Sequence, residues 1–175
     1  LEYLGVEHLG VCLIEEGLLI RASGVRSDIL VFRGFDKSGA QKMIDHQMTP
    51  VVSQWQQIEA LESVADESVK VHLKFNTGMN RLGFHPSEAE KLFSYFQKSK
   101  KLKLKAILSH YFNGEDAFLS DKESHRQTLV MSQLLDFFKP LGVFGHLLNS
   151  GGIASLAKVQ KQSSPEHYLN QYDWG

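Results

Sequence analysis

The sequence predicts an α/β fold of parallel strands, and the residues that follow the strands favour a partial (β/α)8 TIM-type barrel. Six short apolar segments alternate with helical segments, as in βαβ units. Polar residues follow the carboxyl ends of these strands, where barrels carry their active sites: Arg81, His110, Asn149 and Ser150. Periodicity alone does not separate a barrel from a doubly wound sheet. A barrel with six of these strands would lack two of its eight.

The first half of the chain contains three of the expected strands, at residues 8–13, 29–32 and 48–52. Pro50 fits the third strand only near its end or at an edge of the sheet. Glu15 and Glu16 open a helix that continues to residue 22, and residues 37–45 have a helical composition. Ser53 and Gln56 have the spacing of a capping box, which predicts a helix to about residue 64.

Three more strands are expected in the second half, at residues 70–75, 103–110 and 144–149. Two further capping boxes, Ser87 with Glu90 and Ser120 with Glu123, predict the start of helices. Apolar residues at helical spacing mark the buried faces of these two helices: Leu92 and Phe96 in the first, and Val130, Leu134 and Phe138 in the second. A short helix is expected from about Ile153.

Composition excludes several classes of protein. A chain of 175 residues is long enough to bury a core and most simply forms one domain. The 20 acidic and 19 basic residues nearly cancel, so neither a nucleic acid nor an anionic membrane is indicated as a partner. The single cysteine, Cys12, favours a reducing compartment. No apolar run approaches the roughly 18 residues of a membrane span, and we expect a cytoplasmic protein.

Two segments have the chemistry of anion sites. The run KFNTGMNRLGF at 74–84 leaves a strand, passes through glycines, and places Lys74 close in sequence to Arg81. Ser150 precedes two glycines at a strand-to-helix turn. The N–H groups of such a turn, together with the start of the helix, favour a bound phosphate.

The run at 74–84 resembles the K-x-D-T-G-M-x-R-x-G-F signature of the alanine racemases, which depend on pyridoxal phosphate and have a fold-type III barrel. Residues 109–111 (SHY) are similar to the T-H-F/Y segment of that family, and residues 146–150 (HLLNS) to its H-x-x-N-S segment. Residues 9–21 resemble its second strand and the helix that follows, and residues 49–53 resemble its fourth strand. The resemblance implies barrel strands two to seven of eight. Residues 1–175 would then be an incomplete cofactor-binding barrel domain without the family's C-terminal β domain.

The resemblance also implies roles for individual residues. Arg81 would contact the phenolic oxygen of the cofactor and help to hold the substrate carboxylate, a task suited to a permanent bidentate cation. His110 would lie against the pyridine ring, and Asn149 and Ser150 would bind at the phosphate. Considered alone, Arg81 could equally be a solvated surface residue, and His110 a core residue with satisfied hydrogen bonds.

Lys74 matches a lysine that many family members carry as a carbamate, which orients the arginine. An unmodified Lys74 beside Arg81 would be a like-charge neighbour, and its pKa should fall. The alternative is an ordinary lysine with its ammonium group in solvent. Asn76 replaces the family's aspartate and weakens the case for carbamylation. His146 would support an arginine outside this chain, and two glycines after Ser150, where the family has alanines, imply a looser turn.

Both catalytic bases of the family are expected outside the chain. The Schiff-base lysine would precede Leu1, and the tyrosine would come from the missing β domain of a homodimer. Since racemisation needs a base on each face of the substrate, we expect the chain alone to be inactive. Leu1 is not a Met, and residues 172–175 end as a strand should begin, so both ends are expected to be cuts in a longer protein. That parent would interconvert L- and D-alanine, a small amino-acid substrate, for peptidoglycan synthesis.

Other functions remain open at this stage. The chain could be a non-catalytic module that binds pyridoxal phosphate or another metabolite, or part of another racemase or decarboxylase with the same barrel. A serine hydrolase is disfavoured because Ser109 and His110 are adjacent in a strand and should face opposite ways. A metal site is not expected, since the lone cysteine has no partner and the eight histidines are scattered.

Overall fold

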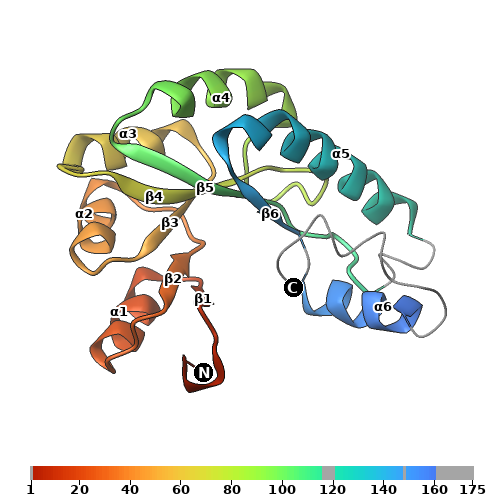
Figure 1. The fold of residues 1–175 in the computed structure, drawn as a ribbon, viewed down its shortest axis with the longest axis horizontal. Helices are drawn as coiled ribbons and strands as arrows, with labels where there is room; N and C mark the ends of the chain where they lie inside the picture. Colours follow the sequence, from red (N-terminus) through yellow and green to blue (C-terminus); the bar gives the residue numbers. More distant parts are fainter. Residues whose placement is uncertain (1, 116–120, 148, 161–175) are drawn as a thin grey trace. The chain divides into compact units, whose positions relative to one another are not determined.

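The computed structural model describes residues 2–115, 121–147 and 149–160. Strands and helices alternate along this part of the chain (Figure 1). The strands are β1 (His8–Val11), β2 (Asp28–Val31), β3 (Thr49–Val52), β4 (Val69–Lys74), β5 (Leu102–Leu108) and β6 (Phe144–His146). The helices are α1 (Ile14–Ala22), α2 (Lys37–Asp45), α3 (Trp55–Val64), α4 (Ala89–Lys98), α5 (Lys122–Phe138) and α6 (Ser150–Gln160). Each predicted strand and helix is present.

The six strands form one sheet in the order β1-β2-β3-β4-β5-β6. The pairings of β1 with β2, β2 with β3, β3 with β4 and β5 with β6 are parallel, with Leu9 opposite Ile29 and Ala106 opposite Phe144. Spatial order therefore equals chain order. A doubly wound sheet reverses its order at a switch point, whereas a barrel adds each strand beside the previous one. The strand order thus agrees with the predicted partial barrel.

The contacts divide the chain into two compact units. The first comprises Leu1–Leu73 with Lys98–Leu104, and the second comprises Lys74–Gln97 with Lys105–Gly175. All of the candidate site residues belong to the second unit.

The first unit has an apolar core between β1, β2 and the helices that follow them. Its buried residues are Val11, Ile29, Val31, Met43 and Met48. Arg21 joins the ends of α1 and α2, because its guanidinium donates to the carbonyl oxygens of Val25 (2.7 Å), Ser27 (3.1 Å), His46 (3.1 Å) and Gln47 (2.8 Å). One arginine thus satisfies four carbonyl oxygens in the segments that follow these two helices.

The second unit packs α4 and α5 on aromatic side chains. The ring of Phe138 lies 5.7 Å from that of Phe75 and 5.8 Å from that of Phe93. Leu92 and Phe96 are buried on α4, as predicted. The buried face of α5 differs from the expected one, since Val130 is only half-buried. The buried residues of α5 recur every three or four positions: Ser124, Gln127, Met131, Leu134 and Phe138.

All three predicted capping boxes are wrong by one or two residues. At α3 the acceptor is Gln57 rather than Gln56, and its Oε1 accepts from the backbone N–H groups of Ser53 and Gln54. At α5 the N-cap is Asp121, which accepts from the Ser124 N–H; Ser120 lies outside the described residues. A carboxylate or a long amide reaches these N–H groups as well as a hydroxyl does, so spacing alone did not select the cap.

The pair Ser87 and Glu90 is also not a cap. A short 3-10 helix (Pro86–Glu88) precedes α4, and its N-cap is His85. The Glu88 carboxylate accepts from the His85 N–H at 3.0 Å, and His85 Nδ1 accepts from the Ser87 N–H at 3.2 Å.

None of the described helices is long and apolar enough to cross a membrane.

Candidate functional site

The signature segment forms a closed loop at the carboxyl end of β4. Phe75 and Phe84 make an isolated parallel bridge. The Asn76 N–H donates to the Phe84 carbonyl at 2.9 Å, and the Phe84 N–H donates to the Lys74 carbonyl at 2.9 Å. Residues 77–83 therefore leave the strand and return to it, so the base of the loop that carries Arg81 is fixed by backbone hydrogen bonds.

Asn76 shapes the inside of this loop. Its Oδ1 accepts from the N–H groups of Gly78 (3.2 Å) and Asn80 (2.9 Å), and its Nδ2 donates to Asn80 Oδ1 at 3.0 Å. Asn80 has a left-handed backbone with φ 57°. An aspartate could accept the same two backbone hydrogen bonds. The replacement of the family's aspartate by Asn76 therefore keeps the loop-forming contacts while removing a negative charge.

Gly83 is required where the loop closes. Its φ is +125°, and a Cβ atom there would lie 2.6 Å from the Phe75 carbonyl carbon and 2.7 Å from the Asn76 nitrogen. Both of these are backbone atoms of the bridge and cannot move aside. The geometry of the loop closure therefore explains why a glycine precedes the final phenylalanine of the signature.

Lys74 is the last residue of β4 and is buried, with 6% of its surface exposed. Its pKa is lowered, first by burial and then by the positive charge of Arg81. No carboxylate of the described residues lies within ion-pair distance of Lys74 or Arg81. The predicted like-charge neighbours are therefore present, and Arg81 itself is exposed to solvent.

His110 follows β5 and belongs to the same electrostatic group. It is half-buried. Its pKa is lowered by burial first, and then by the charges of Lys74 and Arg81. Each of these causes disfavours a positive charge on the imidazole. The carboxyl ends of β4 and β5 thus bring together Lys74, Arg81 and His110.

Asn149 connects this group to the start of α6. Its Nδ2 lies 3.5 Å from His110 Nε2 and 3.4 Å from the Tyr111 carbonyl oxygen, and its Oδ1 accepts from the Gly152 N–H at 2.8 Å. Asn149 therefore caps α6, which begins at Ser150 and not near Ile153 as predicted. The cap offsets the low helix propensity of the glycines. An anion at this turn could contact the exposed Ser150 hydroxyl and the first N–H groups.

The two glycines after Ser150 do not make the turn loose. A Cβ atom at Gly151 would lie 2.9 Å from the Glu115 nitrogen and 3.1 Å from the Gly114 carbonyl carbon. At Gly114 it would lie 2.0 Å from Asn149 Oδ1. The loop after β5 packs directly on the first turn of α6, and the expectation of a looser turn is wrong because backbone contact requires the glycine.

The remaining predicted residue, His146, is the last residue of β6. Its ring lies 6.2 Å from that of Phe144, and its carbonyl oxygen accepts from the Ser109 N–H at 3.1 Å. The Ser109 hydroxyl lies 2.7 Å from Thr77 Oγ1 and donates to the Phe75 carbonyl at 2.9 Å. His110 contacts Asn149, so the adjacent serine and histidine make separate contacts, as expected for a strand.

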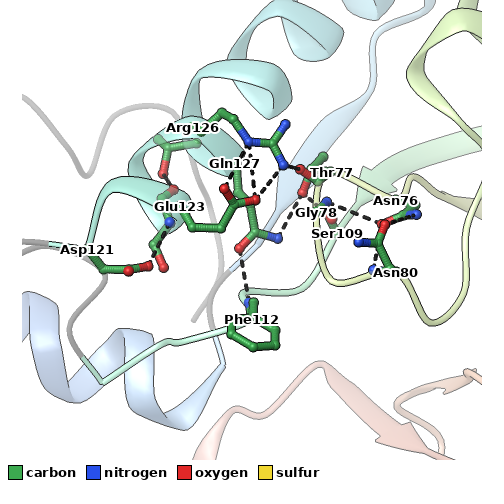
Figure 2. A network of polar contacts seen from close by, with 12 residues as sticks. Asn76, Thr77, Gly78, Asn80, Ser109, Phe112, Asp121, Glu123, Arg126 and Gln127 are labelled. Carbon is green, nitrogen blue, oxygen red and sulfur yellow. Dashed lines mark hydrogen bonds and ion pairs between the residues drawn. The ribbon is translucent and has the colours of Figure 1, made fainter.

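Sequence reasoning missed a polar network behind these loops (Figure 2). Gln127 on α5 contacts the segments after β4 and β5, and Arg126 donates to the Thr77 carbonyl and to the Glu123 carboxylate. A polar residue within the apolar face of a helix was the available signal. Among the described residues, no group of three or more histidine, cysteine or acidic side chains is placed to hold a metal ion.

Residues 1–164 match the family model described as the alanine racemase N-terminal domain. Two similar curated proteins are alanine racemases. The one from Methylacidiphilum infernorum is 29% identical over 87% of this chain and 39% of its own length, and the one from Thermodesulfovibrio yellowstonii is 30% identical over 86% and 40%. The chain therefore spans about two fifths of the length of these relatives.

A solved structure gives the same result for the fold. The alanine racemase of Clostridium difficile 630 superimposes with a TM-score of 0.77 at 22% identity, over 85% of this chain and 40% of that one. This likeness confirms the predicted partial barrel. By the match of its family model over nearly the whole sequence, the chain belongs to the alanine racemase N-terminal domain family.

Proposed function

We propose that this chain is the cofactor-binding barrel segment, strands two to seven, of an alanine racemase that interconverts L- and D-alanine with pyridoxal 5'-phosphate. The observation that carries the proposal is the group of Lys74, Arg81 and His110, which gathers positive charge at the strand ends without a carboxylate partner among the described residues. Asn149 connects this group to a helix start that suits a phosphate. The family membership and the curated relatives support the same function.

The residues present fit such a cofactor. Pyridoxal 5'-phosphate carries an anionic phosphate and an ionisable ring oxygen, and the group offers two basic side chains and an imidazole in one region. Burying a charge without a partner costs free energy, so the lowered pKa of Lys74 marks a group that gains from a nearby anion. When bound, the cofactor supplies an electron sink for the substrate Cα.

The residues of this chain would bind and orient. Arg81 would hold the ring oxygen of the cofactor and the substrate carboxylate through its planar fork of donors. His110 would pack against the ring, and its lowered pKa disfavours a positive charge there. Asn149 and Ser150 would contact the phosphate at the start of α6, where the helix dipole favours negative charge.

Lys74 would act through Arg81. In carbamylation the lysine ammonium first loses a proton, and its uncharged nitrogen then bonds to CO2 and releases a second proton, so that a cation becomes an anion. The lowered pKa raises the uncharged fraction that can react. The product would pair with Arg81 and remove the repulsion between the two side chains. Asn76 would not prevent this step, since its side chain forms hydrogen bonds to Gly78 and Asn80.

Several parts of the proposal concern a longer parent protein. The two proton-transferring bases, a lysine and a tyrosine, would come from outside residues 1–175, with the tyrosine from the partner of a homodimer. Residues 1–175 alone would not racemise alanine. The parent would serve peptidoglycan synthesis in the cytoplasm, and the exposed free thiol of Cys12 suits a reducing compartment.

A binding measurement tests the proposal on the chain itself. Pyridoxine 5'-phosphate is the preferred probe, because it keeps the phosphate and ring oxygen but has an alcohol that cannot react with surface lysines. We expect saturable binding that Arg81→Gln weakens about tenfold or more, as for loss of a charge-assisted hydrogen bond. Arg33→Gln changes an exposed arginine after β2 and should leave the affinity unchanged. Equal affinity for all three proteins would contradict the proposal.

A second measurement separates the enzyme from a binding module. The chain is assayed for interconversion of L- and D-alanine with saturating pyridoxal 5'-phosphate, first alone and then within a protein extended by its flanking coding sequence. We expect turnover only in the extended protein. Probe binding by both proteins without turnover in either would favour a non-catalytic binding module.

A further inference from the structure

One buried side chain connects the two loops of the candidate site, and its role goes beyond packing. Gln127 lies on the buried face of α5 and is fully inaccessible to solvent. The buried residues above and below it on that face are Ser124 and Met131. An apolar residue would fill this position at a lower desolvation cost, so a buried amide needs a reason.

Both ends of the Gln127 amide are used (Figure 2). Its Oε1 accepts from the Phe112 N–H at 3.0 Å. Its Nε2 donates to the His110 carbonyl at 2.9 Å and to Thr77 Oγ1 at 3.3 Å. One side chain thus fixes the backbone on both sides of Tyr111 and reaches the segment that follows β4.

The hydroxyl of Ser109 continues the hydrogen-bond chain from Gln127 and Thr77. Thr77 Oγ1 lies 2.7 Å from Ser109 Oγ, which donates to the Phe75 carbonyl at 2.9 Å. Thr77 and Ser109 are both buried. The chain of hydrogen bonds therefore begins at the backbone of His110 and ends at the bridge residue Phe75, at the base of the loop that carries Arg81.

We propose that Gln127 is a positioning residue that holds the His110 loop against the Arg81 loop and so sets the geometry of the anion site. This inference rests on the proposed function for the identity of the ligand, and on hydrogen bonds alone for the link between loops. Removing the amide would leave the Phe112 N–H and the His110 carbonyl without their partner, and the two loops would lose one of their attachments while the Ser109 hydroxyl contacts remain.

The test compares four folded proteins: wild type, Gln127→Met, Thr77→Val and Gln133→Met. The first two variants remove one polar group each from the link with little change in volume. Gln133 is exposed on the same helix, so its variant is the matched control. The readouts are the dissociation constant for pyridoxine 5'-phosphate and the pKa of His110 from an NMR titration of its imidazole, with unfolding in urea as a measure of stability.

We expect Gln127→Met to raise the dissociation constant about tenfold, which corresponds to about 1.4 kcal/mol. The pKa of His110 should rise toward its ordinary value, because a released loop is better solvated and farther from Lys74 and Arg81. Thr77→Val should act in the same direction by a smaller amount, and it decides the matter if Gln127→Met does not fold. Gln133→Met should change neither readout.

The outcomes distinguish this inference from the proposed function. A stable Gln127→Met protein with an unchanged pKa of His110 and an unchanged dissociation constant would overturn the positioning role. Loss of stability alone, with both readouts preserved, would also overturn it and leave a structural role. If wild type binds no probe, the proposed function fails, and the pKa of His110 in the two variants decides this inference by itself.

Discussion

Two buried polar side chains of the second unit, Gln127 and Lys74, have opposite surroundings. Every polar atom of the Gln127 side chain has a hydrogen-bond partner within the protein. Lys74 has an arginine as its charged neighbour and no carboxylate partner among the described residues. A satisfied buried amide is explained by the fold, whereas a buried cation next to another cation opposes folding. The difference separates a residue whose contacts are complete within the fold from one that, under the proposed function, would gain from a bound anion.

The same contrast applies within the candidate site, between the bases of the Arg81 and His110 loops and the residues expected to contact a ligand. The bases of both loops are fixed by backbone and side-chain hydrogen bonds, including the bridge between Phe75 and Phe84. Arg81 and Ser150, which are expected to contact a ligand, are exposed. Rigid attachments that present exposed charged or polar groups are the arrangement expected of a preorganised binding site.

The largest effect should come from breaking the loop closure. Gly83→Ala places a Cβ atom against the backbone of Phe75 and Asn76 at a positive φ. We expect a loss of about 3 kcal/mol or more in the free energy of unfolding, measured in urea. Gly142→Ala is the control, because Gly142 also has a positive φ (+68°) but nothing within 4 Å of its Cβ position. Its cost should be about 1 kcal/mol, and equal losses for both variants would refute the steric explanation.

Removing the buried cation should stabilise the protein. In CO2-free buffer near neutral pH, Lys74→Met should raise the free energy of unfolding on the order of 1 kcal/mol. Because the folded-state pKa of Lys74 is lowered, the unfolded chain binds more protons, and wild-type stability should rise as pH increases from that pKa toward the ordinary lysine value. Lys74→Met should lose this slope. Lys103→Met changes an exposed lysine of β5 and should keep the wild-type dependence of stability on pH. Identical pH dependence in wild type and Lys74→Met would count against a lowered pKa of Lys74.

Removing the charge of Arg81 should test whether His110 lies in the same site. Arg81→Gln takes away one of the two charges that lower the pKa of His110, so this pKa should rise toward its ordinary value. Burial and Lys74 remain, and the recovery should therefore be partial. An NMR titration of the imidazole measures the change. A pKa of His110 that does not respond to Arg81→Gln would show that the two side chains do not share a site.

The smallest effect is expected from restoring the family's aspartate. Asn76→Asp keeps the acceptor for the Gly78 and Asn80 N–H groups but loses the donation to Asn80 Oδ1. The free energy of unfolding should change by no more than about 0.5 kcal/mol at pH 7. A loss above about 2 kcal/mol in a urea titration would show that the amide itself is essential to the loop.

The sequence predicted the order of strands and helices because apolar periodicity and turn residues are local signals. It predicted the association of Lys74, Arg81 and His110 from a motif and from the rule that carboxyl ends of parallel strands meet. It did not find Gln127: a polar residue within an apolar helix face marks the position, but its pairing with two loops is a tertiary contact that no local pattern encodes. The need for Gly151 was misread for the same reason, because the backbone that contacts it comes from residues 114 and 115.

The most direct measurement is the pKa of His110 in the chain with and without saturating pyridoxine 5'-phosphate. If Lys74, Arg81 and His110 form an anion site, the bound anion offsets the two positive charges, and the pKa of His110 rises on binding. Inorganic phosphate at the same concentration should give a smaller rise. A pKa of His110 that is identical in the free and saturated protein would contradict the claim that these three residues form the cofactor site.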